Sequence, residues 1–176
     1  AESVPGQGST FWFTARFPFC TKTPPATRPQ LRGRKVLIAD DLPEAREVLT
    51  AMTAGLGMRP TPVADGDQAL AEIRRADAAR EPYDLLLLDW RMPGMDGLET
   101  LHRLRALPLD QPPLSLLVTA FDDPGLRVEA EKAGFRRVLS KPLTAANLVD
   151  ALAEAAALPG YVLAALDPEQ GEAERL

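Results

Sequence analysis

Four consecutive leucines, Leu85 to Leu88, are followed directly by an acidic residue, Asp89. A continuous apolar run of this length is typical of a strand that other elements cover on both faces. An ionised carboxylate is costly to bury without a partner, so Asp89 should lie where the strand leaves the core. The segment RMPGMDG that follows holds one proline and two glycines, which indicates a loop. The chain therefore carries a carboxylate to the end of a buried strand and then turns.

Strands and helices are expected to alternate after residue 34. The prolines of the second strand, PTPVA, fit a sheet edge better than a sheet centre. The alternation predicts an α/β fold, with a parallel sheet and helices on both faces. The expected strands are residues 36–39, 60–64, 84–89, 114–120 and 135–140, and the expected helices are residues 43–57, 67–79, 97–107, 124–134 and 144–158.

Polar side chains stand at the ends of four of these strands. Asp40 and Asp41 end the first, Asp89 the third and Thr119 the fourth, and Lys141 follows the fifth. Any one of them alone is most simply a turn residue or a helix cap. The carboxyl ends of parallel strands meet at one edge of a sheet, where such folds place their functional groups. The whole set therefore predicts one pocket.

The chemistry of this pocket follows from its charges. Three carboxylates in one cleft repel one another, and a hard divalent cation relieves that repulsion. Oxygen ligands favour Mg²⁺, with Mn²⁺ as an alternative, over zinc. Asp89 is then a candidate nucleophile that forms an acyl phosphate. Lys141 would neutralise a phosphoryl oxygen, and Thr119 would donate a hydrogen bond to another.

The motifs VLIADD, LLLLDWRMPGMDG, LLVTA and LSKP occur in this order along residues 35–158. In this order and spacing the segment resembles the receiver domain of response regulators in bacterial two-component signalling. The resemblance implies a flavodoxin-like (βα)5 fold, with a doubly wound parallel sheet in the strand order 2-1-3-4-5. It also implies a cis peptide bond between Lys141 and Pro142.

The same resemblance assigns roles to the pocket residues. Asp89 is the expected site of phosphorylation. Asp41, Asp89 and the backbone carbonyl of Arg91 are the expected direct ligands of Mg²⁺, and Asp40 is expected to act mainly through water. Thr119 and Lys141 are the expected contacts of the phosphoryl group. The small residue Ala120 leaves a path open to the aspartate.

Two features concern how the domain would respond to phosphorylation. Thr119 and Val138 occupy the switch positions, but receivers usually carry an aromatic residue or histidine at the place of Val138. We expect the aromatic switch to be absent or replaced, unless Val138 is simply part of the strand core. Arg91 and Phe121 flank the pocket and could shield an acyl phosphate from water, so we hypothesise a phosphoryl lifetime of minutes or more. The bland alternative is that both are loop residues without a kinetic role.

The first residues differ from the rest. ESVPGQGSTFWFTARFPF, within residues 1–19, resembles the end of the ATP-binding domain of sensor histidine kinases, and its aromatic residues alternate as in a strand. We expect residues 20–34 to be a proline-rich linker, residues 35–158 the receiver, and residues 159–176 a C-terminal tail. This order is that of a hybrid histidine kinase. An unrelated hairpin is the alternative for the first region.

Composition narrows the partners and the location. A net charge of −5 argues against nucleic-acid binding, and the single cysteine, Cys20, fits a reducing compartment. No apolar run is long enough to span a bilayer, so we expect a cytoplasmic fragment without membrane contact. Whether the parent protein is anchored in the inner membrane stays open. The chain begins with Ala1 rather than Met, and we interpret it as a piece of a longer protein.

The expected partner is a kinase or phosphotransfer domain that bears a phosphohistidine. The aromatic residues of the first region need a surface, and we hypothesise a homodimer through residues 11–19 or packing on the receiver of the same chain. The ATP-binding motifs of histidine kinases are absent, so this fragment is expected not to be an enzyme beyond promoting its own phosphorylation and dephosphorylation. The only histidine, His102, is interpreted as a helix-surface residue.

Two rival functions remain at this point. The first is a receiver-like interaction module that is not phosphorylated in use, which Val138 mildly favours. The second is a Mg²⁺-dependent phosphatase with an aspartyl nucleophile. Such phosphatases usually carry an acid two residues after the nucleophile, where this chain has Arg91. We therefore favour a receiver that accepts a phosphoryl group on Asp89.

Overall fold

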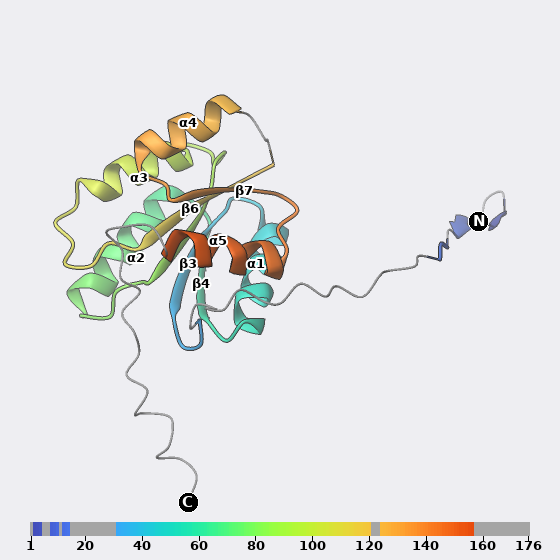
Figure 1. The fold of residues 1–176 in the computed structure, drawn as a ribbon, viewed down its shortest axis with the longest axis horizontal. Coiled ribbons are helices and arrows are strands. Elements are labelled where there is room, and N and C mark those ends of the chain that lie inside the picture. Colours follow the sequence, from blue (N-terminus) through green and yellow to red (C-terminus); the bar gives the residue numbers. More distant parts are fainter. Residues whose placement is uncertain (1, 5–7, 11, 15–30, 121–123, 157–176) are drawn as a thin grey trace, which may run out of the picture.

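A computed structural model describes residues 2–4, 8–10, 12–14, 31–120 and 124–156. Its centre is a parallel sheet of five strands in the order β4-β3-β5-β6-β7, shown in Figure 1. Numbered from the first strand of this sheet, the order is 2-1-3-4-5, as the sequence predicts. The strands are β3 (Lys35–Ala39), β4 (Arg59–Val63), β5 (Leu85–Asp89), β6 (Leu114–Thr119) and β7 (Arg137–Ser140).

Five helices alternate with these strands and cover both faces of the sheet (Figure 1). Their ends lie within three residues of the expected ones, and the strand ends lie within two. Among the described residues, no helix is long and apolar enough to cross a membrane. The helices are α1 (Pro43–Gly55), α2 (Gly66–Ala78), α3 (Gly97–Arg105), α4 (Pro124–Ala133) and α5 (Ala145–Ala156).

The sequence encodes several helix starts locally. The Asp65 side chain caps α2 by accepting a hydrogen bond from the backbone N–H of Gln68, and Asp96 caps α3 through Glu99. Helix α1 begins at Pro43, whose fixed φ suits the first turn. These caps place each helix directly after the loop that leaves a strand end.

The strands divide their side chains between two hydrophobic cores. Leu37, Leu86 and Leu88 join the core beneath α2, α3 and α4. Val36, Ile38 and Leu87 point to the other face and join the core beneath α1 and α5. Side chains of a strand alternate between faces, so an unbroken apolar run is what a two-sided core requires. The LLLLD segment is buried along its whole length for this reason.

Strand β4 occupies an edge of the sheet. It pairs only with β3 among the described strands, in a register that places Pro60 beside Val36 and Pro62 beside Ile38. Proline has no backbone N–H to donate, and an edge strand has one side on which that donor is not needed. The edge position predicted from the two prolines is confirmed.

The aromatic strand predicted in the first region is not found in its described part. Instead β1 (Glu2–Val4) and β2 (Gly8–Thr10) form an antiparallel pair in which Glu2 faces Thr10. Trp12 and Phe13 follow this pair outside any strand. The remaining aromatic residues, Phe11, Phe17 and Phe19, lie outside the described residues.

Two glycines provide a matched test of the packing beneath Asp89. A Cβ on Gly97 would lie 2.5 Å from the Asp89 carbonyl oxygen and 3.0 Å from a Leu117 methyl group, whereas a Cβ on Gly55 meets nothing within 4 Å. We expect Gly97→Ala to lower the free energy of unfolding by about 1–3 kcal/mol through overpacking. Gly55→Ala should raise it by about 0.5 kcal/mol. Urea unfolding measures both, and equal changes would contradict this packing.

Candidate functional site

The strand ends bring the predicted residues to one edge of the sheet. Asp40 directly follows β3, Asp89 is the last residue of β5, Thr119 is the last residue of β6, and Lys141 directly follows β7. The Lys141 backbone N–H donates to the Thr119 carbonyl at 2.7 Å, which ties the last two together. Parallel pairing of the four strands makes their carboxyl ends coincide.

Lys141 links the two acids of this edge. Its Nζ lies 2.6 Å from Asp40 Oδ2 and 2.6 Å from Asp89 Oδ1. The two carboxylates are almost fully buried, with 1% and 9% of their side-chain surface exposed, and the lysine is 23% exposed. One ammonium therefore bridges two carboxylates and offsets part of the repulsion between them.

Burial and charge act on these groups in opposite directions. Burial raises the pKa of Asp89 above 3.8, because it outweighs the hydrogen bond and positive charge of Lys141. Burial lowers the pKa of Lys141, but the hydrogen bonds and charges of Asp40 and Asp89 more than offset that effect, and the pKa rises above 10.5. Lys141 is therefore charged at neutral pH and available to an anion.

An open cavity of about 190 Å³, here called the Asp89 pocket, lies beside this ion pair. The backbone N–H of Arg91 donates to Asp89 Oδ2 at 2.8 Å, so the loop after β5 holds the carboxylate in place. The backbone N–H of Leu42 similarly donates to Asp40 Oδ1 at 3.0 Å. The pocket is lined by Asp41, Leu42, Asp89, Arg91, Thr119, Ala120 and Lys141.

The donor atoms of the pocket suit a hard cation. Asp41 and Asp89, two carboxylate residues, line the same cavity, and Arg91 lines it as well. Among the described residues, no cluster of three or more acidic, histidine or cysteine side chains is arranged to enclose a metal ion. Mg²⁺ needs only one or two carboxylates and keeps several waters, so the residues present fit this ion.

Two contacts at the site were not predicted from the sequence. The Arg91 guanidinium lies 4.8 Å from the centre of the Trp90 ring, and Trp90 packs against the core beneath α2, α3 and α4. Arg46 of α1 donates to the Asp40 carbonyl at 2.6 Å. The adjacent Trp-Arg pair was a signal for the first contact. The second depends on how α1 folds back over β3, which no local pattern shows.

The other predicted positions are accounted for as follows. Val138 is half-buried in β7 and packs against the core beneath α2, α3 and α4, in line with the strand-core alternative. His102 is exposed on α3, as predicted. The Lys141–Pro142 peptide bond is cis. Phe121 lies outside the described residues.

The sequence model of the response regulator receiver domain matches residues 36–153, more than half of the chain. The chain belongs to the response regulator receiver domain family. The five-stranded order and the acids at the strand ends are those expected of this receiver. The fold and the family predicted from the sequence are both confirmed.

Two curated relatives are sensory proteins of bacteria. The receiver is 33% identical over 132 residues to the sensory/regulatory protein RpfC of Xanthomonas campestris pv. campestris, an alignment that covers 73% of this chain. It is 34% identical over 181 residues to the sensor histidine kinase AruS of Pseudomonas aeruginosa, an alignment that covers 99% of this chain. The chain spans only 17% of the length of either relative.

Solved structures show the same fold. The receiver domain of the sensor histidine kinase PA1611 from Pseudomonas aeruginosa superposes with a TM-score of 0.58 at 34% identity, covering 66% of this chain and 91% of that one. That structure has a magnesium ion coordinated in its active-site cleft. Chemotaxis protein CheY4 of Vibrio cholerae superposes with a TM-score of 0.63 at 26% identity, covering 70% of this chain and 98% of that one.

The shared lysine gives a prediction for stability. Lys141→Met leaves two buried carboxylates without their cation, so we expect the free energy of unfolding at pH 7 to fall by on the order of 2 kcal/mol. Lys132→Met, which removes an exposed lysine of α4, should change it by less than about 0.5 kcal/mol. Urea unfolding in a chelator-treated buffer measures both variants.

The pH dependence of the same stabilisation has a defined sign. The folded-state pKa of Lys141 is raised above 10.5, so its contribution is complete below about pH 10.5 and is lost as the pH rises through the raised pKa. The difference in free energy of unfolding between wild type and Lys141→Met should therefore not change through titration of Lys141 near pH 7. It should shrink only at alkaline pH. Equal stability of Lys141→Met and Lys132→Met at pH 7 would contradict the shared ion pair.

Proposed function

We propose that this receiver accepts a phosphoryl group from a phosphohistidine onto Asp89 and that it is the receiver of a hybrid sensor histidine kinase. The observation that carries the proposal is the position of Asp89 at the Asp89 pocket, with Lys141 Nζ 2.6 Å from its Oδ1. An acceptor carboxylate has to reach the surface from a rigid element, and the end of β5 provides this. Burial raises the pKa of Asp89, and the hydrogen bond and positive charge of Lys141 act against that rise, which favours the carboxylate form needed for a nucleophile.

The transfer uses the residues of the pocket in distinct roles. An Asp89 carboxylate oxygen attacks the phosphorus, the P–N bond to the donor imidazole breaks, and the imidazole leaves with the bonding electron pair and takes a proton. Lys141 binds an oxygen of the transferred group through its charge, and the Thr119 hydroxyl donates to another. Lys141 can turn from Asp89 to the phosphoryl oxygen while Asp40 still holds it.

Asp41, Asp89 and the backbone carbonyl of Arg91 would hold Mg²⁺, with Asp40 acting through water and Mn²⁺ as an alternative ion. When bound, Mg²⁺ supplies charge neutralisation for the phosphoryl oxygens. The magnesium ion in the PA1611 receiver supports this assignment. We infer that the fragment promotes its own phosphorylation and dephosphorylation without being a kinase, because residues of the chain hold the Asp89 carboxylate in position.

Assignment to a hybrid kinase is supported by the extent of the match to AruS. That alignment covers 99% of this chain, so it includes the first region and the linker as well as the receiver. We infer that residues 1–19 are the end of a kinase ATP-binding domain, residues 20–34 a linker and residues 159–176 a tail. The donor is then a phosphohistidine of a kinase or phosphotransfer domain, in the cytoplasm, and neither nucleic acid nor membrane contacts this fragment.

The homodimer contact through residues 11–19 stays a prediction. The two described aromatic residues of that segment, Trp12 and Phe13, are 59% and 90% exposed, which is consistent with a surface that another chain covers. The rival function, a receiver-like module that is not phosphorylated, is favoured only by Val138. The phosphatase alternative needs an acid where Arg91 stacks on Trp90, and we do not propose it.

Intact mass after incubation with acetyl phosphate and Mg²⁺ tests the proposed function. We expect a gain of one phosphoryl group in the wild type and no gain in Asp89→Asn, because the amide is not a nucleophile for this transfer. Removal of Mg²⁺ with a chelator should abolish the gain, since the repulsion between phosphate and carboxylates is then uncompensated. Asp110→Asn, an exposed acid outside the pocket, is the matched control and should be phosphorylated normally.

The same time course gives the phosphoryl lifetime, for which we expect minutes or more because Arg91, which lines the Asp89 pocket, and Phe121 would shield the acyl phosphate from water. No gain in the wild type would be followed by a beryllofluoride binding measurement, which does not depend on a small-molecule donor. Failure of both measurements would favour the unphosphorylated module over the acceptor.

The switch offers a separate prediction. Val138 lacks the ring that usually moves when the threonine turns toward the phosphoryl group, so we expect beryllofluoride to change amide exchange little in α4 and α5. The Val138→Tyr variant should restore a larger change in α4 and β7. A large coupled change in the wild type would show that Val138 does not weaken the response.

A further inference from the structure

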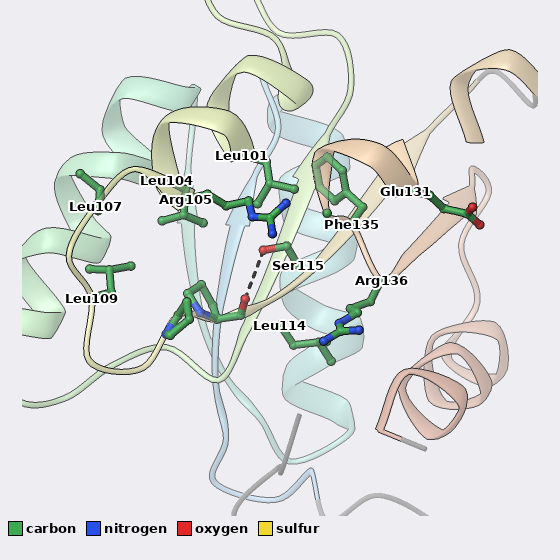
Figure 2. Close-up of a pocket in the computed structure, with 13 residues that line it drawn as sticks. Leu101, Leu104, Arg105, Leu107, Leu109, Leu114, Ser115, Glu131, Phe135 and Arg136 are labelled. Atoms are coloured by element: carbon green, nitrogen blue, oxygen red, sulfur yellow. Dashed lines mark hydrogen bonds between the residues drawn. The ribbon is translucent and has the colours of Figure 1, made fainter. Parts of the chain in front are cut away.

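A second and larger cavity lies at the amino end of β6, whereas Asp89 lies at the carboxyl ends of the strands. Its volume is about 580 Å³, within the range of small-molecule sites. It lies between the carboxyl ends of α3 and α4 and the start of β6, and we call it the α3–α4 pocket (Figure 2). Strand β6 runs from Leu114 at this pocket to Thr119 at the Asp89 pocket, so the two ends are roughly 17 Å apart at about 3.3 Å per residue.

Rigid apolar side chains form much of the wall of the α3–α4 pocket. Leu101 and Leu104 of α3 are buried, as are Leu114 of β6 and Phe135 after α4. Figure 2 shows them converging on the pocket from different elements. The Ser115 hydroxyl, also buried, donates to the Pro113 carbonyl at 3.2 Å and keeps its oxygen available as an acceptor. Part of the pocket wall thus belongs to the packed core, and the loop that joins α3 to β6 completes the wall.

The charged side chains of the pocket favour an anion. Arg105 and Arg136 are its two basic residues and Glu131 is its one acidic residue, whereas the whole chain carries a net charge of −5. The pocket is thus locally positive in an acidic protein. Figure 2 shows the Arg105 guanidinium between Leu104 and Phe135, with Glu131 on the far side of Phe135.

The position of Arg105 is held by helix α4. Its Nη1 donates to the Ala133 carbonyl at 2.8 Å, at the carboxyl end of that helix. Gly134, with a φ of +105°, leaves the space that the guanidinium occupies, since a Cβ there would collide with it. The bond to Ala133 uses one of five N–H donors, so Arg105 stays in place and keeps donors for a ligand.

We propose that the α3–α4 pocket binds a small amphipathic carboxylate. The carboxylate pairs with Arg105, Arg136 supplies the second positive charge, and the apolar chain lies against Leu107 and Leu109, which line the pocket and are only half-buried. A phosphate or other bare anion would leave this apolar wall uncovered, and a neutral apolar molecule would leave the two arginines unused. The site is separate from the Asp89 pocket and does not depend on the function proposed for it.

Amide NMR of the full chain during a titration with sodium octanoate tests this inference. We expect saturable shifts at Leu114, Ser115, Phe135 and Arg136, and much weaker binding of 1-octanol, which has the same chain without the charge. Arg105→Gln should weaken octanoate binding about tenfold, since a charge-assisted hydrogen bond is lost. Arg136→Gln leaves the hydrogen bond from Arg105 to the Ala133 carbonyl intact. It should weaken octanoate binding about threefold through the loss of a nearby charge.

A matched control separates the pocket from general electrostatics. Arg103→Gln removes a positive charge from α3, the helix that also carries Arg105. Arg103 pairs with Glu99 and does not line the pocket, so octanoate affinity should change by less than about twofold. Equal binding of octanoate and octanol, shifts centred outside the pocket, or no saturable shift in the wild type would each overturn the inference. Equal loss of binding in Arg103→Gln and Arg136→Gln would do the same.

Discussion

The contact of one lysine with two buried acids is the interaction on which the site depends. Lys141 reaches Asp40 across 101 positions of the chain and Asp89 across 52, with both distances at 2.6 Å. Burial disfavours the charged form of a carboxylate, and the nearby ammonium favours it, so Lys141 compensates for the burial of both acids. The same ammonium is the group that a phosphoryl oxygen would displace from Asp89. Stability and the proposed chemistry therefore draw on a single charge.

The packing of the sheet holds the residues of this contact in place. Two hydrophobic cores hold β3, β5 and β6 from both sides, so their carboxyl ends are rigid and lie side by side. Side chains at the strand ends are therefore held rigidly. The surrounding loops add backbone N–H groups that donate to Asp40 and Asp89. The amino end of β6 is equally rigid, and there the α3–α4 pocket combines apolar walls with two arginines.

Much of the fold was predictable because its signals are local. The leucine run before Asp89, the prolines of β4 and the aspartate caps of α2 and α3 each act within a few residues. The first region shows the limit of such signals. Alternating aromatic residues suit a strand, but a strand also needs a partner, and the described residues 12–14 of that segment lie outside any strand. Pairing is a property of two segments, so no single pattern could decide it.

The amino-acid sequence by itself determined the order of strands and helices and the residue types at the strand ends, because hydrophobic periodicity and helix caps act over short distances. Only the tertiary structure decided that Lys141 contacts both Asp40 and Asp89, that Arg91 stacks on Trp90, and that Arg105 fits over Gly134 at the end of α4. These contacts join elements that fold separately along the chain. Their geometry depends on the packing of helices against the sheet, where a side chain's partner is set by position in space rather than by distance in sequence.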